Sequence, residues 1–223
     1  LKIIAKKEMI LHVYDSAKKS SNNVIVATPD EKIIETVQKY GGKAIKTNVN
    51  HKTGTDRIFE VFDKILKRKP KIVINLQGDM PNIQPDEINK LIFHMKKNLC
   101  DISTLASKLN EDEINNPNVV KVTTEKKIEE GNFSKAKDFF RIKKDKIFDK
   151  IYHHIGIYAF TNKALIRYVD LKRSTLELER NLEQLRALEN KMIIDVGFTS
   201  SYPLSVDTEE DYEKIKKIMK KNV

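Results

Sequence analysis

The sequence predicts an α/β fold in which a mostly parallel sheet is flanked by helices. In the first hundred residues, short apolar runs typical of buried strands alternate with segments whose apolar residues recur at helical spacing. Such alternation favours parallel strands joined by right-handed helical crossovers. The stretch 72–81 shows this most clearly, because its apolar run ends at Gly78, Asp79 and Pro81, which are residue types that form a tight turn.

The elements before residue 100 follow from periodicity and from helix-end signals. Asp30 is placed to cap the second helix, and Gly41 and Gly42 close it. The expected helices cover residues 8–19, 31–40, 55–67 and 85–97. The expected strands cover residues 24–28, 43–47 and 72–76.

The alternation loosens after residue 101. We expect strands at 102–109, 119–124, 153–161 and 192–198, and helices at 162–170 and 175–190. In the second of these helices, Leu178, Leu182 and Leu185 form the predicted buried stripe. A last helix follows Asp207, which fits a capping box with Glu210.

No repeat or long linker divides the chain, so we expect one domain over 1–223. Residues 126–150 are highly charged and poorly periodic, and we expect a mobile flap there rather than regular structure.

Composition narrows the functional classes. Lys and Arg number 42 against 32 Asp and Glu, giving a net charge of +10. The lysines are spread over every predicted helix and alternate with acidic residues, which favours an anionic small-molecule substrate over nucleic acid. The single cysteine, Cys100, excludes an intramolecular disulfide, indicates a reducing cytoplasmic setting, and is expected to be a small core residue. No apolar run is long enough to span a bilayer, so no membrane partner is expected.

Asp79 is a candidate metal ligand. It follows the carboxyl end of a predicted strand, where open α/β sheets bind ligands, and Mg²⁺ prefers hard oxygen donors of this kind. The alternative for Asp79 is an ordinary turn. For Asp207, the spacing alone favours a plain helix N-cap.

Five segments together resemble the 3-deoxy-manno-octulosonate cytidylyltransferase (CMP-Kdo synthetase) family, essentially over the whole chain. They are 51–57 (His-Lys-Thr-Gly-Thr-Asp-Arg), 75–79 (Asn-Leu-Gln-Gly-Asp), 154–158 (His-Ile-Gly-Ile-Tyr), 182–186 (Leu-Glu-Gln-Leu-Arg) and 205–211 (Ser-Val-Asp-Thr-Glu-Glu-Asp). The resemblance implies a Rossmann-like nucleotidyltransferase fold, with a smaller mixed region for sugar binding and dimerisation at about residues 101–200. It also implies a cytoplasmic homodimer that uses Mg²⁺, CTP and the sugar acid Kdo to make CMP-Kdo and pyrophosphate for lipopolysaccharide biosynthesis.

The resemblance assigns nucleotide and metal roles in the first part of the chain and at its end. Asp79 and Asp207 match the magnesium ligands, which are also the expected catalytic residues. The expected nucleotide-binding residues are Gly54, Thr55, Arg57 and Gln77. From the residues alone, the same pattern also fits a helix entry with an exposed arginine, and Gln77 also fits an exposed turn residue.

The resemblance assigns sugar binding to His154, Glu183, Gln184 and Arg186. The guanidinium of Arg186 suits a carboxylate through its two parallel N–H groups. The alternatives are a core histidine at position 154 and a solvated helix face with an ion pair between Glu183 and Arg186.

The sequence also departs from the family pattern. The family's first strand and its triphosphate-binding loop would precede Leu1, so we expect a chain truncated at its N-terminus. Met80 stands where the family commonly has Glu, and Lys135 stands for Arg, which leaves sugar binding by 126–150 open. Two alternatives therefore remain: an inactive or non-catalytic relative, and a cytidylyltransferase for another sugar acid such as sialic acid.

Overall fold

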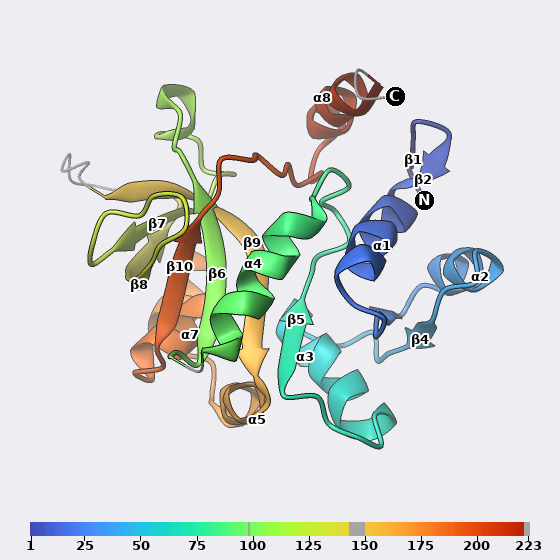
Figure 1. Cartoon of the computed structure of the whole chain (residues 1–223), viewed down its shortest axis with the longest axis horizontal. Coiled ribbons are helices and arrows are strands. Elements are labelled where there is room, and N and C mark those ends of the chain that lie inside the picture. The colour runs from blue at the N-terminus through green and yellow to red at the C-terminus, as the bar shows by residue number, and fades with distance from the viewer. Residues whose placement is uncertain (98, 143–149, 221–223) are drawn as a thin grey trace. The chain divides into compact units, whose positions relative to one another are not determined.

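The computed structural model describes residues 1–97, 99–142 and 150–220 and has a mixed α/β architecture, which confirms the predicted fold class (Figure 1). The chain forms two compact units. The first contains Leu1–Arg68, Gln77–Asn89 and Tyr202–Val223, and the second contains Lys69–Leu76 and Lys90–Ser201.

The first unit has two small sheets. An antiparallel pair, β1 (Ile3–Ile4) and β2 (Lys7–Glu8), precedes the helices. A parallel pair, β3 (Val26–Thr28) and β4 (Ala44–Lys46), is joined by α2. The helices of this unit are α1 (Met9–Ser20), α2 (Glu31–Lys39), α3 (Gly54–Glu60) and α8 (Glu209–Lys220). A π-helical turn, Val61–Ile65, continues α3.

One hydrophobic cluster of this unit lies between α1 and α2, where Leu11, Tyr14 and Val37 pack together. The predicted cap of α2 is confirmed, because the side chain of Asp30 accepts hydrogen bonds from the backbone N–H groups of Lys32 and Ile33. This contact satisfies donors that a helix start leaves without an intrahelical partner.

The second unit contains a six-stranded sheet in the order β5-β9-β6-β10-β8-β7, and β7 also pairs with β9. The strands are β5 (Ile72–Asn75), β6 (Ile102–Ser107), β7 (Lys121–Thr124), β8 (Phe133–Phe140), β9 (Ile151–Thr161) and β10 (Ile194–Phe198). The helices of this unit are α5 (Asn162–Asp170), α6 (Thr175–Arg180) and α7 (Gln184–Glu189), with a short 3₁₀ helix at Glu111–Glu113. Helix α4 (Pro85–Lys96) includes residues of both units.

The expectation of mostly parallel strands is wrong for this sheet. Strands β6 and β10 are parallel, but β9 is antiparallel to β5 and β6, and β8 is antiparallel to β7 and β10. The helix–strand alternation that favoured parallel strands ends near residue 101, and β9 comes later. This long apolar strand, with Ile157 and Ala159 fully buried, lies between β5 and β6.

Two further expectations need correction. Residues 133–140 form strand β8 instead of a flap, because they pair with strands on both sides; residues 143–149 of the expected flap lie outside the described residues. The helix expected at 175–190 is two short helices separated by Asn181, whose φ is +52°. Leu182 and Leu185 are buried as predicted, but Leu178 is 57% exposed, because the stripe does not continue through the turn.

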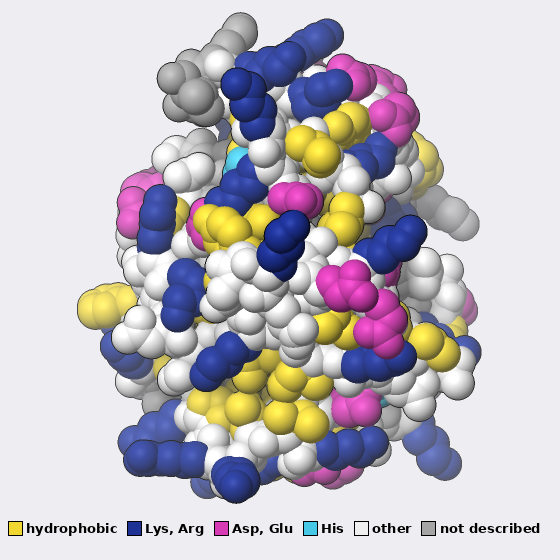
Figure 2. All heavy atoms as spheres, turned by 90° about the vertical axis from the view of Figure 1, so that its right-hand side faces the viewer, with side chains coloured by type: hydrophobic (Ala, Val, Ile, Leu, Met, Phe, Trp, Pro, Cys, Tyr) yellow, Lys and Arg dark blue, Asp and Glu magenta, His cyan; other side chains and the backbone are white. Residues whose placement is uncertain are grey.

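Surface and core properties agree with several features of the sequence. On the face drawn in Figure 2, Lys and Arg side chains are spread among acidic and apolar ones and do not form one basic tract. Cys100 is buried, as predicted. Among the described residues, no helix has both the length and the apolar character needed to cross a bilayer.

The left-handed conformation of Asn181 gives a test of the α6–α7 turn. Asn181→Ala should lower the free energy of unfolding by roughly 1 kcal/mol, because alanine disfavours positive φ. Asn181→Gly should lose less, since glycine adopts this conformation without a β-carbon clash. Urea unfolding followed by circular dichroism measures both variants, and equal losses would contradict the turn.

Candidate active site

Asp79 lies in the turn after β5 and is bound to the segment that precedes α8. Its Oδ2 accepts a hydrogen bond from Ser205 Oγ at 2.8 Å, and its backbone carbonyl accepts one from Val206 N at 2.9 Å.

Asn82 makes two further hydrogen bonds to the segment before α8. Its Nδ2 donates to the carbonyl of Tyr202 at 3.2 Å, and its Oδ1 accepts from Leu204 N at 2.9 Å. These contacts hold the loop before Asp207 against the turn of Asp79.

Asp207 is exposed and does not cap α8. Thr208 and Asp211 form the cap, because Thr208 N donates to Asp211 Oδ2 at 3.0 Å and Asp211 N donates to Thr208 Oγ1 at 3.2 Å. The capping box predicted for Asp207 and Glu210 is therefore wrong by one residue. The carboxylate of Asp207 is not needed by the helix.

The carboxylate of Asp79 is buried and only partly hydrogen-bonded within the described residues. Burial raises its pKa, the hydrogen bond from Ser205 lowers it, and the negative charge of Asp207 raises it again, with a net upward shift. Within the described residues, Asp79 Oδ1 is buried and has no hydrogen-bond partner. Two nearby carboxylates, one with an unpartnered buried oxygen, fit the hard oxygen donors that Mg²⁺ prefers.

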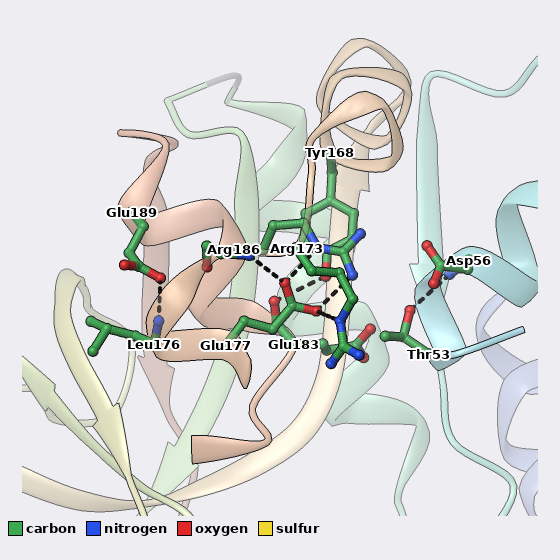
Figure 3. Close-up of polar contacts among 10 residues, drawn as sticks. Thr53, Asp56, Tyr168, Arg173, Leu176, Glu177, Glu183, Arg186 and Glu189 are labelled. Atoms are coloured by element: carbon green, nitrogen blue, oxygen red, sulfur yellow. Dashed lines mark hydrogen bonds and ion pairs between the residues drawn. The ribbon is translucent and has the colours of Figure 1, made fainter. Parts of the chain in front are cut away.

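Gly54 and Gln77, two of the predicted nucleotide-binding residues, lie close together. A β-carbon at position 54 would be 2.8 Å from Gln77 Nε2, so a glycine leaves room for this amide beside the start of α3. Thr53 caps α3 by accepting a hydrogen bond from Asp56 N at 3.1 Å (Figure 3).

Arg57 and Thr55 are more enclosed than an exposed helix entry would require. Arg57 Nη1 donates to Thr47 Oγ1 at 2.7 Å and to the carbonyl of Asn48 at 3.0 Å. Arg57 therefore helps to hold the loop after β4. Thr55 is 1% exposed.

Glu60 holds the same loop, because its carboxylate accepts a hydrogen bond from Asn48 N at 2.9 Å. The pKa of Glu60 is lowered to about 2, and its hydrogen bond with His51 is the largest cause.

His154, on β9 of the second unit, has the surroundings of a core histidine. It is 6% exposed, and its Nε2 lies 3.0 Å from Thr104 Oγ1. Burial lowers the pKa of His154 to about 3, so its imidazole is neutral at pH 7. At pH 7 the imidazole of His154 can therefore form hydrogen bonds with a sugar but carries no positive charge.

Glu183, Gln184 and Arg186 stand where α7 begins, and the structure treats them differently. Glu183 is partly exposed and Gln184 is buried. Arg186 is 2% exposed and bonds to Glu177: its Nε lies 2.8 Å from Oε2, and its Nη2 lies 2.7 Å from Oε1 (Figure 3). Arg186 therefore makes a buried ion pair with Glu177 of α6.

Sequence reasoning missed three residues that build these sites: Ser205, Glu177 and Tyr168. Ser205 precedes the Val-Asp-Thr motif, and the sequence gives no signal for it apart from that motif. Glu177 lies between two apolar residues in a helical pattern, which does not distinguish it from a solvent-exposed polar residue. Burial opposes ionisation of Glu177, but hydrogen bonds from Arg186 and Arg173 outweigh it and lower its pKa.

A group of side chains that could ligate a metal ion lies in the second unit. The ligand atoms of His94, Cys100 and Asp195 are buried and lie within 4.8 Å of one another. His94 Nε2 is 2.8 Å from Asp195 Oδ2, and burial, with a contribution from Asp195, raises the pKa of Cys100 to about 12. This nitrogen, sulfur and oxygen set differs from the oxygen donors that suit Mg²⁺, so Asp79 and Asp207 remain the magnesium candidates.

Comparison with known sequences places the chain among the cytidylyltransferases. A family model described as cytidylyltransferase matches residues 1–194. A 3-deoxy-manno-octulosonate cytidylyltransferase of Bartonella bacilliformis is 40% identical over 219 residues, covering 97% of this chain and 89% of the relative. A relative of the same name from Thermodesulfovibrio yellowstonii is 43% identical over 231 residues, covering 98% of this chain and 91% of that protein.

Comparison with solved structures agrees. A CMP:2-keto-3-deoxy-manno-octonic acid synthetase complexed with CTP matches with a TM-score of 0.88 and 32% identity, covering 100% of this chain and 92% of that one. A 4-diphosphocytidyl-2C-methyl-D-erythritol synthase from Anaerococcus prevotii matches with a TM-score of 0.63 and 16% identity, over 98% of this chain and 91% of that one. The second match shows a shared fold alone.

The raised pKa of Asp79 predicts a stability gain when its charge is removed. In EDTA at pH 8, Asp79→Asn should raise the free energy of unfolding by about 1 kcal/mol, because a neutral amide is less costly to bury than a carboxylate. A carboxyl whose pKa is higher in the folded state destabilises the fold above that pKa and ceases to do so below its unfolded value.

The difference between Asp79→Asn and the wild type should therefore shrink as the pH falls through the folded pKa of Asp79 and its unfolded value near 4. Urea unfolding at a series of pH values measures it. Glu210→Gln, which removes an exposed carboxylate, is the control. A less stable Asp79→Asn variant at pH 8 would contradict the electrostatic description of the site.

Proposed function

Because the chain belongs to the 3-deoxy-manno-octulosonate cytidylyltransferase family, we propose that it transfers a cytidylyl group from CTP to Kdo. The products are CMP-Kdo, for lipopolysaccharide biosynthesis, and pyrophosphate. The observation that carries the proposal is identity of about 40% to relatives of this name along 97% of the chain. The carboxylates of Asp79 and Asp207 support it, because phosphoryl-group chemistry needs a site for a cation that neutralises phosphate charge.

In the proposed reaction, the anomeric hydroxyl oxygen of Kdo forms a bond to the α-phosphorus of CTP. The bond between this phosphorus and the oxygen bridging to the β-phosphate breaks, pyrophosphate leaves with the bond electrons, and the hydroxyl proton passes to solvent. Mg²⁺, when bound, would neutralise phosphate charge and lower the pKa of the attacking hydroxyl. We propose that Asp79 and Asp207 hold this ion, and that Ser205 fixes the orientation of Asp79 by its hydrogen bond at 2.8 Å.

We propose that the first unit binds the nucleotide. Gln77 is the proposed side-chain contact, and Gly54 leaves the space in which its amide lies. Arg57 and Thr55 support this element, since Arg57 ties α3 to the loop after β4 and Thr55 is a buried residue of α3.

We propose that the second unit binds the sugar acid. Glu183 is the partly exposed member of its group and can accept hydrogen bonds from sugar hydroxyls. Gln184 and His154 are buried, belong to motifs that match the family, and can both donate and accept hydrogen bonds. We further propose a homodimer acting in the cytoplasm; size-exclusion chromatography with light scattering tests the dimer.

The first test of the function is pyrophosphate release by this polypeptide with CTP and Kdo, with each omitted in turn. We expect release only when both substrates and Mg²⁺ are present, since the hydroxyl nucleophile, the triphosphate and the cation are all required. Replacing Kdo with sialic acid tests the alternative substrate. A folded protein that releases no pyrophosphate would favour the non-catalytic relative.

The second test separates the metal role of Asp207 from its position before a helix. Asp207→Asn should lower kcat by about a hundredfold or more, because a ligand to the charge-neutralising cation is lost. Glu210→Gln is the matched control, since Glu210 is exposed nearby and pairs only with Lys214 at the helix surface among the contacts described. Equal rates for the two variants would contradict the assignment of Asp207.

A further inference from the structure

We propose that Glu177, Arg186 and Tyr168 are positioning residues that hold the backbone of Glu183 for the sugar acid. In this arrangement Arg186 acts through its neighbours and does not touch the sugar. The inference rests on the proposed function, because it concerns the group that we assign to Kdo. It departs from the sequence motif, in which Arg186 was expected to bind the sugar directly.

The first step is that Glu177 engages Arg186. Glu177 is fully buried, and Arg186 donates from Nε and from Nη2 to its two carboxylate oxygens at 2.8 and 2.7 Å (Figure 3). Each oxygen has one more donor: Arg173 Nε lies 2.8 Å from Oε1, and Ser174 N lies 3.1 Å from Oε2. A paired guanidinium and carboxylate that are both out of water form a strong, directional contact. Turning Arg186 toward a ligand would leave this carboxylate without its main partner.

The second step is that Tyr168 joins this ion pair to Glu183. The guanidinium of Arg186 lies over the ring of Tyr168, 4.6 Å from its centroid. The hydroxyl of the same tyrosine donates to the backbone carbonyl of Glu183 at 2.9 Å (Figure 3). Tyr168 is 1% exposed and stands on α5, so its ring is held by a different helix. A continuous series of contacts therefore runs from Glu177 through Arg186 and Tyr168 to Glu183.

The third step is that Tyr168 adds a contact from another helix to the start of α7. Glu183 lies between the left-handed Asn181 and the first residue of α7, and no side-chain cap bond forms at this position. Its backbone carbonyl accepts one hydrogen bond from Arg186 N at 3.1 Å, within the first turn, and a second from the Tyr168 hydroxyl at 2.9 Å. Leu176 N also donates to Glu189 Oε2 at 2.9 Å, which ties the start of α6 to the end of α7. A shift of about 1 Å in a substrate-binding group is enough to lower activity strongly.

Tyr168→Phe is the sharpest test, because it removes the hydroxyl and keeps the ring under Arg186. We expect the KM for Kdo to rise about tenfold, with the KM for CTP and the Tm close to wild type. Arg186→Lys keeps the positive charge but loses the double contact with Glu177, and it should raise the KM for Kdo similarly. Arg180→Lys is the matched control: Arg180, the last residue of α6, likewise pairs with a carboxylate, that of Asp138, and its replacement should leave both KM values unchanged.

The outcomes separate the explanations. If Arg186→Lys raises the KM for Kdo and Tyr168→Phe does not, Arg186 contacts the sugar and the inference is overturned. If Tyr168→Phe lowers the Tm and leaves both KM values unchanged, its role is structural and the inference is again overturned.

Calorimetric titration with Kdo distinguishes failure of the inference from failure of the proposed function. A wild-type chain that binds Kdo without releasing pyrophosphate would contradict the proposed function. The dissociation constant of Tyr168→Phe would still test positioning, with weaker binding by about tenfold expected. A wild-type chain that neither binds nor turns over Kdo would overturn both.

Discussion

The structure depends on one constraint: a carboxylate that is buried away from water must accept hydrogen bonds from the protein or bind a cation. Both oxygens of Glu177 are fully hydrogen-bonded, because two arginines and a backbone N–H donate four hydrogen bonds to them. These contacts hold together the two short helices α6 and α7. Asp79 meets this constraint only in part, because Ser205 binds one oxygen and the other remains buried and unpartnered within the described chain. The same chemical group thus stabilises one unit and, in the other, retains capacity for a cation.

Much of the fold could be predicted from the sequence because its signals are local. Helix periodicity and the cap at Asp30 placed α1, α2 and α4 within a residue or two. Expectations were wrong where long-range pairing or one dihedral angle decided the outcome. Strand β9 pairs with strands far away in the chain, and no local pattern encodes its direction. At Asn181, a single left-handed residue ends a helix whose apolar spacing continues through it.

The candidate site was predictable to the extent that its residues belong to short motifs. The turn of Asp79 and the Val-Asp-Thr segment were found because residue type and spacing match a family pattern. The supporting residues were not found, because a glutamate at helical spacing has the same sequence signature whether it faces water or an arginine. Burial separates the two cases, and the 0% exposure of Glu177 arises from the fold and not from its neighbours in sequence.

The first unit is assembled from three stretches of chain, and the last of them begins at Tyr202. The contacts of Asn82 with Tyr202 and Leu204 join the last stretch to the turn of Asp79. During synthesis, Asp79 emerges from the ribosome long before Asp207, and the larger part of the second unit, Lys90–Ser201, is made in between. The early part of the nascent chain therefore carries half of an acidic pair, and this pair forms only after translation has passed the whole second unit.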